Sequence, residues 1–343
     1  MFLELFVTLL LLAQYVEDEN SSYELYQSAT IPSSPIIKKP CIDSYQCWED
    51  YYIDLASSSG SLTALADLKD SSEQDVFLKQ NCHALLHRIG FYAAFDYITL
   101  AEALSHADTF CLSGMYHGIL EGFMVRDGSD LVARLTDVCA EIPGRERYAF
   151  DYYMCVHGLG HGLMAYFEQD LFDSLAACET LEGTWEQHSC AGGVFMQNIM
   201  GNNDLPSLYL KEDDVLYPCN DVDEKFKHAC FGMQTSYILT RFDNDYAHTF
   251  AICSVVEEPY RTICYESIGR DVSGYTGSNA IEAHRLCSKS ETDEGREHCI
   301  RGAAFNFVMN DSATENANTL CEREPKPFAT ECRRRMNEYL SSF

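Results

Sequence analysis

The chain has 343 residues, 46% of them hydrophobic, and a formal net charge of −29 at pH 7. This length and apolar content suffice for a sizeable core, in one large domain or a repeat array. The acidic excess argues against a nucleic-acid binder, because contacts to phosphate need a basic surface. It is compatible with cationic partners and with a plain solvated acidic surface.

Residues 1–16 predict a signal peptide. The run from Leu5 to Ala13 is almost entirely apolar and ends at a small residue, although Glu4 is acidic and no Lys or Arg precedes the run. About nine apolar residues are too few to span a bilayer, which takes about 20. No later stretch is a candidate span, so we expect no stable membrane span. An amphipathic N-terminal helix is the alternative.

Residues 17–60 are acidic and then rich in Ser and Pro, which predicts a linker. Within it, Cys41 and Cys47 are close enough in sequence to close a small loop. Leu62 to Leu68 then predicts a short helix. We expect residues 61–343 to form one domain of helical repeats.

Sixteen cysteines, an even number, are spread along the chain. Such usage is typical of an oxidising compartment, so we expect a secreted, cell-surface or secretory-lumen protein. Glycosylation sequons at Asn20 and Asn310 agree with a glycoprotein of this kind.

One pattern recurs from Cys111 onward: a cysteine opens an apolar, often Gly-containing helix, and a second helix ends at another cysteine. The opening cysteines recur every 33 to 44 residues, which is typical of a helical-repeat array. They are Cys111, Cys155, Cys190, Cys230, Cys264, Cys299 and Cys332. Glycine recurs two or three positions later, which indicates close helix packing, because Gly within a helix costs about 1 kcal/mol relative to Ala.

The closing cysteines are Cys139, Cys178, Cys219, Cys253, Cys287 and Cys321. The simplest connectivity joins each to the next opening cysteine, with Cys82–Cys111 and Cys41–Cys47 completing eight bridges. Sequence does not determine pairing, so this connectivity is a hypothesis. The predicted fold is all-α, a disulfide-stapled α/α repeat array or solenoid that can curve toward a closed toroid.

The segment from Asp243 to Cys253, leading to Cys264, resembles the cysteine-rich Sel1-like repeats, relatives of the tetratricopeptide repeat. The resemblance covers the architecture of roughly residues 82–340. It implies an α-solenoid fold and carries over no catalytic residue. The histidine-bearing segments also resemble a group of cysteine-rich repeat proteins with Cys-His-x-x-x-His and His-Gly-x-Gly-His-Gly elements, which implies no function.

Histidines concentrate in the first three cysteine-led segments. His157 and His161 lie four residues apart, so on a helix they share one face. The same step recurs in two earlier segments. His117 and His161 are both sixth after an opening cysteine, so we expect them to be neighbours on adjacent helices. The six predicted metal ligands are His83, His87, His117, Glu121, His157 and His161.

The C-terminal repeats provide an internal control. Their sixth positions hold Met196, Ser236, Arg270 and Phe305, none of which extends the histidine row. The histidines are therefore no general packing requirement of the repeat. The competing interpretation is that they are core residues that fill tight helix contacts.

Imidazole favours Zn, Cu, Fe and Ni, so a divalent transition metal is the expected cofactor, Zn first and Cu or Fe as alternatives. An open coordination position could activate water, with Glu121 as a ligand or as the catalytic general base. These features favour a metal-dependent hydrolase, with an oxidoreductase as an alternative, acting on a small-molecule, peptide or glycan substrate. Two further hypotheses are a non-catalytic scaffold for a protein or glycan partner, and a metal-binding protein without turnover.

Two connectors interrupt the repeats. Residues 141–154 are rich in Arg and Tyr and directly precede the His157 motif, so they are either a rim over the histidines or a surface loop. Residues 201–218 are irregular and acidic.

Overall fold

The computed structural model describes residues 41–340, except 43, 141, 143, 201–206 and 312. Residues 1–40 and Cys41–Phe343 form separate units, and we describe the second. The predicted signal peptide, the linker up to residue 40 and the Asn20 sequon lie outside the described residues, as does the Asn310 side chain.

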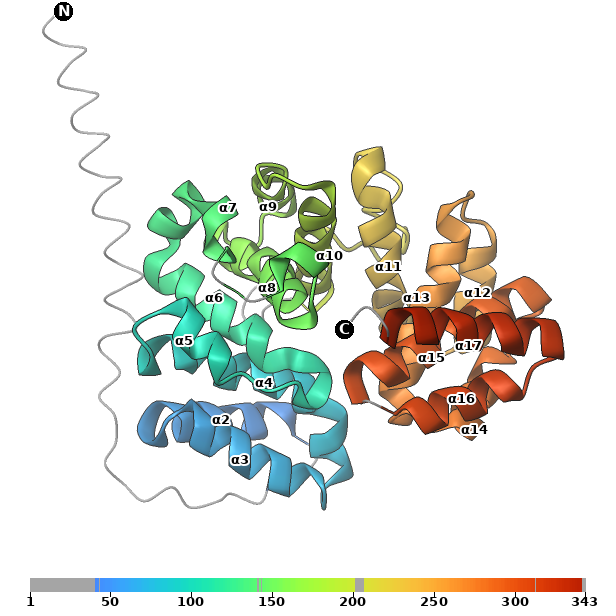
Figure 1. The fold of residues 1–343 in the computed structure, drawn as a ribbon, viewed down its shortest axis with the longest axis horizontal. Coiled ribbons are helices and arrows are strands. Elements are labelled where there is room, and N and C mark those ends of the chain that lie inside the picture. Colours follow the sequence, from blue (N-terminus) through green and yellow to red (C-terminus); the bar gives the residue numbers. More distant parts are fainter. Residues whose placement is uncertain are drawn as a thin grey trace, which may run out of the picture. The chain divides into compact units, whose positions relative to one another are not determined.

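Every regular element in the described part of the chain is a helix (Figure 1), which confirms the all-α prediction. The elements are α2 (Tyr45–Ser59), α3 (Ser61–Ser72), α4 (Val76–Asp96), α5 (Leu100–Ser105), α6 (Phe110–Ala133), α7 (Leu135–Val138), the 3₁₀ turn η1 (Arg145–Arg147), α8 (Phe150–Tyr166), α9 (Leu171–Cys178), α10 (Thr184–Met200), α11 (Glu224–Arg241), α12 (Tyr246–Ser254), α13 (Tyr260–Thr276), α14 (Ala280–Cys287), α15 (Asp293–Asp311), α16 (Thr314–Glu322) and α17 (Lys326–Leu340).

Long helices alternate with short ones, as expected for α/α hairpins. The short helices α9, α12 and α14 each begin after an Asp or Asn whose side chain accepts a backbone N–H of the first turn: Asp170, Asp245 and Asn279. Such caps supply partners for N–H groups that the helix leaves unpaired, at about 1 kcal/mol each. They set where the second helix of each hairpin begins.

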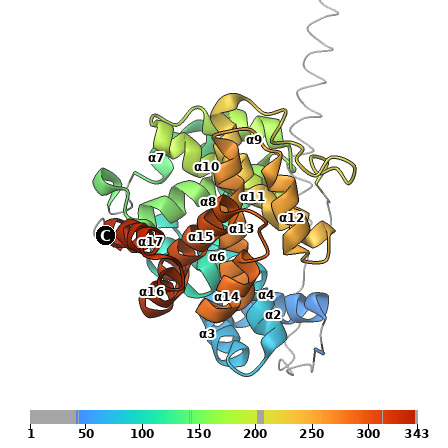
Figure 2. The ribbon, with the colours of Figure 1, turned by 90° about the vertical axis from the view of Figure 1, so that its right-hand side faces the viewer.

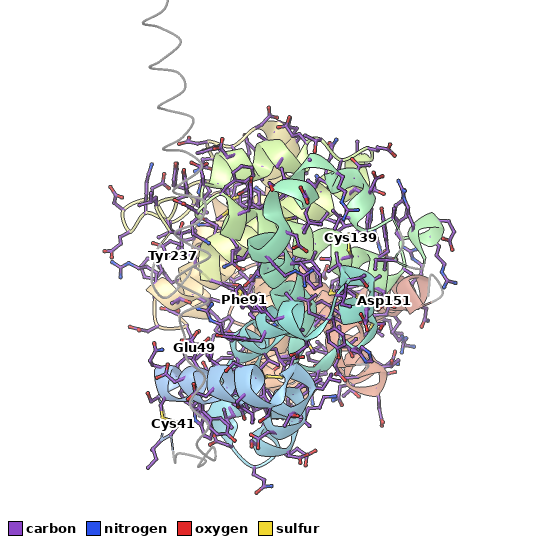
Figure 3. The ribbon with its side chains drawn as sticks, turned by 90° about the vertical axis from the view of Figure 1, so that its left-hand side faces the viewer. Cys41, Glu49, Phe91, Cys139, Asp151 and Tyr237 are labelled. Carbon is purple, nitrogen blue, oxygen red and sulfur yellow. A yellow bond between two sulfur atoms is a disulfide. The ribbon has the colours of Figure 1, made fainter. Side chains whose placement is uncertain are left out.

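The linker prediction is wrong from Tyr45 onward, because Tyr45–Ser59 is helix α2. Trp48, Tyr52 and Leu55 recur at helical spacing and are buried, and α2 packs on α3 and α4. The acidic composition hid this apolar stripe. Figure 3 shows Glu49 on this helix; its carboxylate lies 2.6 Å from the Arg88 guanidinium. The predicted helix at 62–68 is confirmed as part of α3.

All sixteen cysteines are paired, in the simplest connectivity. The bridges are Cys41–Cys47, Cys82–Cys111, Cys139–Cys155, Cys178–Cys190, Cys219–Cys230, Cys253–Cys264, Cys287–Cys299 and Cys321–Cys332. The last six span 11 to 16 residues. Loops of that size stabilise a fold by up to about 3 kcal/mol each in the chain-entropy model.

The opening cysteines do not open their helices, contrary to the prediction, except that Cys111 is the second residue of α6. Cys155 lies in the second turn of α8 and Cys190 in the second turn of α10. The residues that precede these cysteines form a first helical turn. This places the sulfur beside the end of the preceding short helix.

Backbone contact between long helices explains the recurring glycines. A Cβ built on Gly118 of α6 would lie 2.0 Å from the His87 carbonyl oxygen of α4. One built on Gly193 of α10 would lie 1.9 Å from the His157 carbonyl oxygen of α8. Only glycine permits this approach, which confirms that the glycines serve helix packing.

The array curves back on itself within the second unit. Helix α15 contacts α6, although about five repeats separate them along the chain (Figure 2). The Lys79 side chain of α4 comes within 3.9 Å of a Cβ position at Gly277, the residue after α13. Early and late helices therefore meet, as a solenoid curving toward closure requires.

Among the described helices, none combines the length and the apolar character needed to cross a bilayer.

Candidate metal centre

The structure brings all six predicted residues together in the interior. Helix α4 supplies His83 and His87, α6 supplies His117 and Glu121, and α8 supplies His157 and His161. The rings of His117 and His161 stack with centroids 4.4 Å apart and an interplanar angle of 9°, as their equal register predicts. Three overlapping triads each place a ligand atom of every member within 4.8 Å of the other two: His83/His87/His117, His117/His157/His161 and His87/Glu121/His161.

The cluster is dry. His161 is 0% exposed, His117 and His157 are each 2% exposed, and Glu121 is 7% exposed. His83 alone is partly exposed, so any approach from solvent is on its side.

In the first triad, hydrogen bonds determine which ring nitrogens carry protons. His83 Nδ1 lies 2.9 Å from the Cys111 carbonyl oxygen, and His87 Nδ1 lies 2.7 Å from Glu121 Oε1. Both partners accept, so each Nδ1 carries the proton and each Nε2 of the neutral ring presents a lone pair. The two Nε2 atoms nevertheless lie 3.3 Å apart, and His117 Nδ1 lies 3.2 Å from His87 Nε2. These three nitrogen atoms lie close together, but there are too few protons for each close pair to form a hydrogen bond.

The second triad contains three unsatisfied nitrogens. His117 Nε2, His157 Nδ1 and His161 Nε2 are buried and lack a hydrogen-bond partner within the described chain. Buried polar groups are nearly always paired, and an unpaired one costs about 1–3 kcal/mol. Three such atoms on one triad are therefore a strong sign of a ligand site.

Glu121 holds two histidines in place. Its Oε1 accepts from His87 Nδ1 at 2.7 Å and lies 3.6 Å from His161 Nδ1. The sequence analysis missed Gln197 of α10, whose Oε1 lies 2.8 Å from the same His161 nitrogen. The sequence pointed to Gln197 only by its position: it directly follows Met196, the sixth residue after Cys190.

Burial dominates the electrostatics of the cluster. Desolvation lowers the pKa of His83 and His87 to about 3 and that of His157 to about 4. Burial likewise lowers the pKa of His117 and His161 well below 6.5, with neighbouring imidazoles adding to the effect. It raises the pKa of Glu121. The imidazoles are therefore neutral at pH 7, as metal ligands must be.

We expect the metal-free protein to lose stability as the pH falls from about 6.5 toward 4. Because their pKa values are lowered in the folded state, these histidines bind more protons when the protein is unfolded. The free energy of unfolding therefore decreases as the pH decreases. The net slope should be at least about 1.4 kcal/mol per pH unit, since one histidine contributes that much. Glu121, with its raised pKa, acts in the opposite direction but is a single group. Denaturant titrations of chelator-treated protein at pH 7, 6 and 5 measure the slope, which should be smaller in His157→Gln. A pH-independent midpoint would contradict this prediction.

Two arginines lie near the cluster, and each is paired with a carboxylate. The guanidinium of Arg270 lowers the pKa of His83 and His157, and it lies 2.6 Å from the Asp271 carboxylate. Arg88 lowers the pKa of His87 and pairs with Glu49. Each pairing weakens the repulsion between the guanidinium group and a cation in the cluster.

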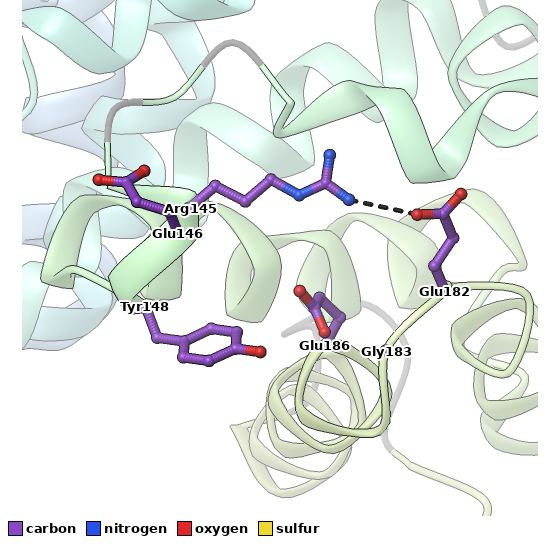
Figure 4. Close-up of a pocket in the computed structure, with 6 residues that line it drawn as sticks. All are labelled: Arg145, Glu146, Tyr148, Glu182, Gly183 and Glu186. Atoms are coloured by element: carbon purple, nitrogen blue, oxygen red, sulfur yellow. Dashed lines mark hydrogen bonds and ion pairs between the residues drawn. The ribbon is translucent and has the colours of Figure 1, made fainter.

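A separate surface pocket of about 530 Å³ is lined by Arg145, Glu146, Tyr148, Glu182, Gly183 and Glu186 (Figure 4). Arg145 bridges it to Glu182 at 3.3 Å. The segment predicted as a connector at 141–154 thus contributes Arg145, Glu146 and Tyr148 to this pocket. Its last residues belong to α8, where the Tyr153 ring centroid lies 5.5 Å from that of His157.

Comparison with protein-family models, curated proteins and solved structures finds no match. The likeness to Sel1-like repeats therefore rests on the helical, disulfide-stapled architecture alone.

Proposed function

We propose that this chain is a transition-metal protein of an oxidising compartment whose first ion is held by His83 Nε2, His87 Nε2 and His117 Nδ1. The main support is the close approach of these nitrogens: His87 Nε2 lies 3.3 Å from His83 Nε2 and 3.2 Å from His117 Nδ1. Tetrahedral ligands with metal–nitrogen bonds of about 2.0–2.1 Å lie about 3.3–3.4 Å apart. A cation among the nitrogens would replace lone-pair repulsion by coordination.

An all-imidazole set selects the kind of ion. Imidazole suits Zn, Cu, Fe and Ni, whereas Ca and Mg prefer oxygen ligands. Zinc is the first choice because the nitrogen separations match tetrahedral coordination, with copper or iron as alternatives. The eight disulfides support a secreted, cell-surface or lumenal location.

Turnover is proposed only for small substrates. A metal with an open position lowers the pKa of bound water to about 7, which suits hydrolysis. The partly exposed His83 marks the accessible side, while the other ligands are buried, so a long peptide or a folded glycan has no access to them. Metal binding without turnover is the second candidate, and the burial of the cluster favours it. A scaffold for a protein or glycan partner is the third.

The role we propose for Glu121 is to orient His87 and His161 through their Nδ1 atoms. A carboxylate behind a metal-bound histidine fixes the ring and raises its basicity. The two contacts to ring nitrogens support this role over that of a general base, since they occupy the carboxylate oxygen nearest to the rings.

Elemental analysis tests the proposal. Protein expressed through an oxidising secretory route should contain stoichiometric metal, and the double variant His83→Ala, His87→Ala should lose it from the first site. The matched control is His188→Ala, His228→Ala, because these rings pair at 5.3 Å outside the cluster. Circular dichroism verifies that both variants keep their helices. A metal-free wild type, even after incubation with Zn, Cu and Fe, would mean that the histidines are packing residues.

A further inference from the structure

His117 faces two different groups of histidines with its two nitrogens. Its Nδ1 lies 3.2 Å from His87 Nε2, in the first triad. Its Nε2 is buried without a partner among the described residues. His117 is also a member of the second triad. The ring centroids of His87 and His157 each lie 5.0 Å from that of His117, so His117 occupies the middle of the cluster.

No neutral tautomer satisfies both nitrogens of this ring. If Nδ1 carries the proton and donates to His87, Nε2 is a buried lone pair without a donor. If Nε2 carries the proton, that N–H is buried without an acceptor. Either form carries the cost of an unpaired buried polar atom.

The second triad repeats this problem on the other side of the ring. Hydrogen bonding to Gln197 assigns the proton of His161 to Nδ1, which leaves its Nε2 as a lone pair. A backbone hydrogen bond with Ser189 engages His157, while its Nδ1 has no partner in the described structure. The three residues offer ligand atoms within 4.8 Å of one another, so an ion needs modest side-chain adjustment to contact all three.

We propose that the cluster is a dinuclear centre in which a second ion binds His117 Nε2, His157 Nδ1 and His161 Nε2, and the His117 imidazolate bridges the two ions. This inference rests on the proposed function, which supplies the first ion. Two metal–nitrogen bonds form on the ring, one at each nitrogen; the remaining N–H bond breaks and its proton passes to solvent. No electron is transferred, and both ions keep their oxidation state.

The charges around the site support two cations. The bridging imidazolate is an anion between them, and with metal–nitrogen bonds of about 2.0–2.1 Å on opposite sides of one ring the ions lie about 6 Å apart. Glu121 adds a carboxylate next to His87 and His161. The net charge of −29 favours cation uptake by the chain as a whole.

Copper(II) loading tests the bridge directly. The fully loaded wild type should contain two copper ions per chain, with an integrated low-temperature EPR signal well below that of two independent ions, because an imidazolate couples their spins antiferromagnetically. His157→Ala should contain one ion and show the full signal of one isolated copper. The control His228→Ala, an exposed residue outside the cluster, should match the wild type.

Each alternative outcome is decisive. Two ions with the full signal of two isolated coppers would overturn the bridge. One ion in the wild type, still bound in His157→Ala, would overturn the second site and leave the proposed function intact. An absence of copper from the wild type would overturn both. The wild-type measurement carries the test even if a variant folds poorly.

Discussion

Gly193→Ala is expected to destabilise the fold by about 3 kcal/mol, the upper end of the usual cost of overpacking. The added Cβ would lie 1.9 Å from the His157 carbonyl oxygen. The backbone of α10 determines the Cβ position and the oxygen belongs to the backbone of α8, so no side-chain rotation relieves the clash. Helices α8 and α10 must move apart, which also withdraws Gln197 from His161. For a domain of about 300 residues, with an unfolding entropy of about 2.1 cal/mol/K per residue, that cost corresponds to a fall in Tm of about 5 °C.

Gly232→Ala is the matched control. Gly232 lies within α11, and the nearest atom to its added Cβ is 3.8 Å away, which is ordinary contact. Replacing an unconstrained helical glycine by alanine stabilises by about 0.5–1 kcal/mol. Calorimetry on the two variants should therefore give shifts of opposite sign. Equal Tm values would show that the α8–α10 contact tolerates a methyl group.

Glu121→Gln is expected to weaken metal binding about 10–100-fold while leaving the saturating stoichiometry unchanged, as for the loss of an outer hydrogen-bond partner of a ligand. The amide keeps the size of the side chain but removes the negative charge behind His87 and His161. Competition titration with a chelator of known affinity measures the change.

Glu324→Gln is the control for this prediction, because Glu324 is also a buried carboxylate but pairs with Arg296 and His284, outside the cluster. Its metal affinity should stay close to that of the wild type. If Glu121→Gln instead lost an ion at saturation, Glu121 would be a ligand rather than an orienting group. Unchanged affinity would contradict both roles.

Much of the architecture could be predicted from periodicity. The cysteine spacing predicted the repeat and its bridges, since a closing and an opening cysteine separated by 11 to 16 residues span one short connector. The recurring glycines predicted close contact between helices, because a helical glycine is unfavourable unless it lets two backbones approach. Helix α2 was missed because its acidic and Ser-rich surface outweighed the stripe of Trp48, Tyr52 and Leu55.

The helix starts were also misplaced, since an opening cysteine marks the site of a covalent bond rather than a cap. A cap is decided by which side chain can reach a free N–H, as Asp170 does before α9. Gln197 was missed for another reason: it acts across the α8–α10 contact, and its importance appears only once His161 is known to face it.

Which six side chains come together in the candidate metal centre followed from the sequence, because a four-residue step on a helix and an equal offset from a cysteine determine which side chains share a face. The tertiary structure decided the chemistry of each nitrogen. Whether His83 Nε2 is a lone pair depends on the Cys111 carbonyl, and whether His117 Nε2 has a partner depends on three packed helices. Tautomers and unpaired atoms are properties of contacts between helices, and helical periodicity specifies only the face of each helix.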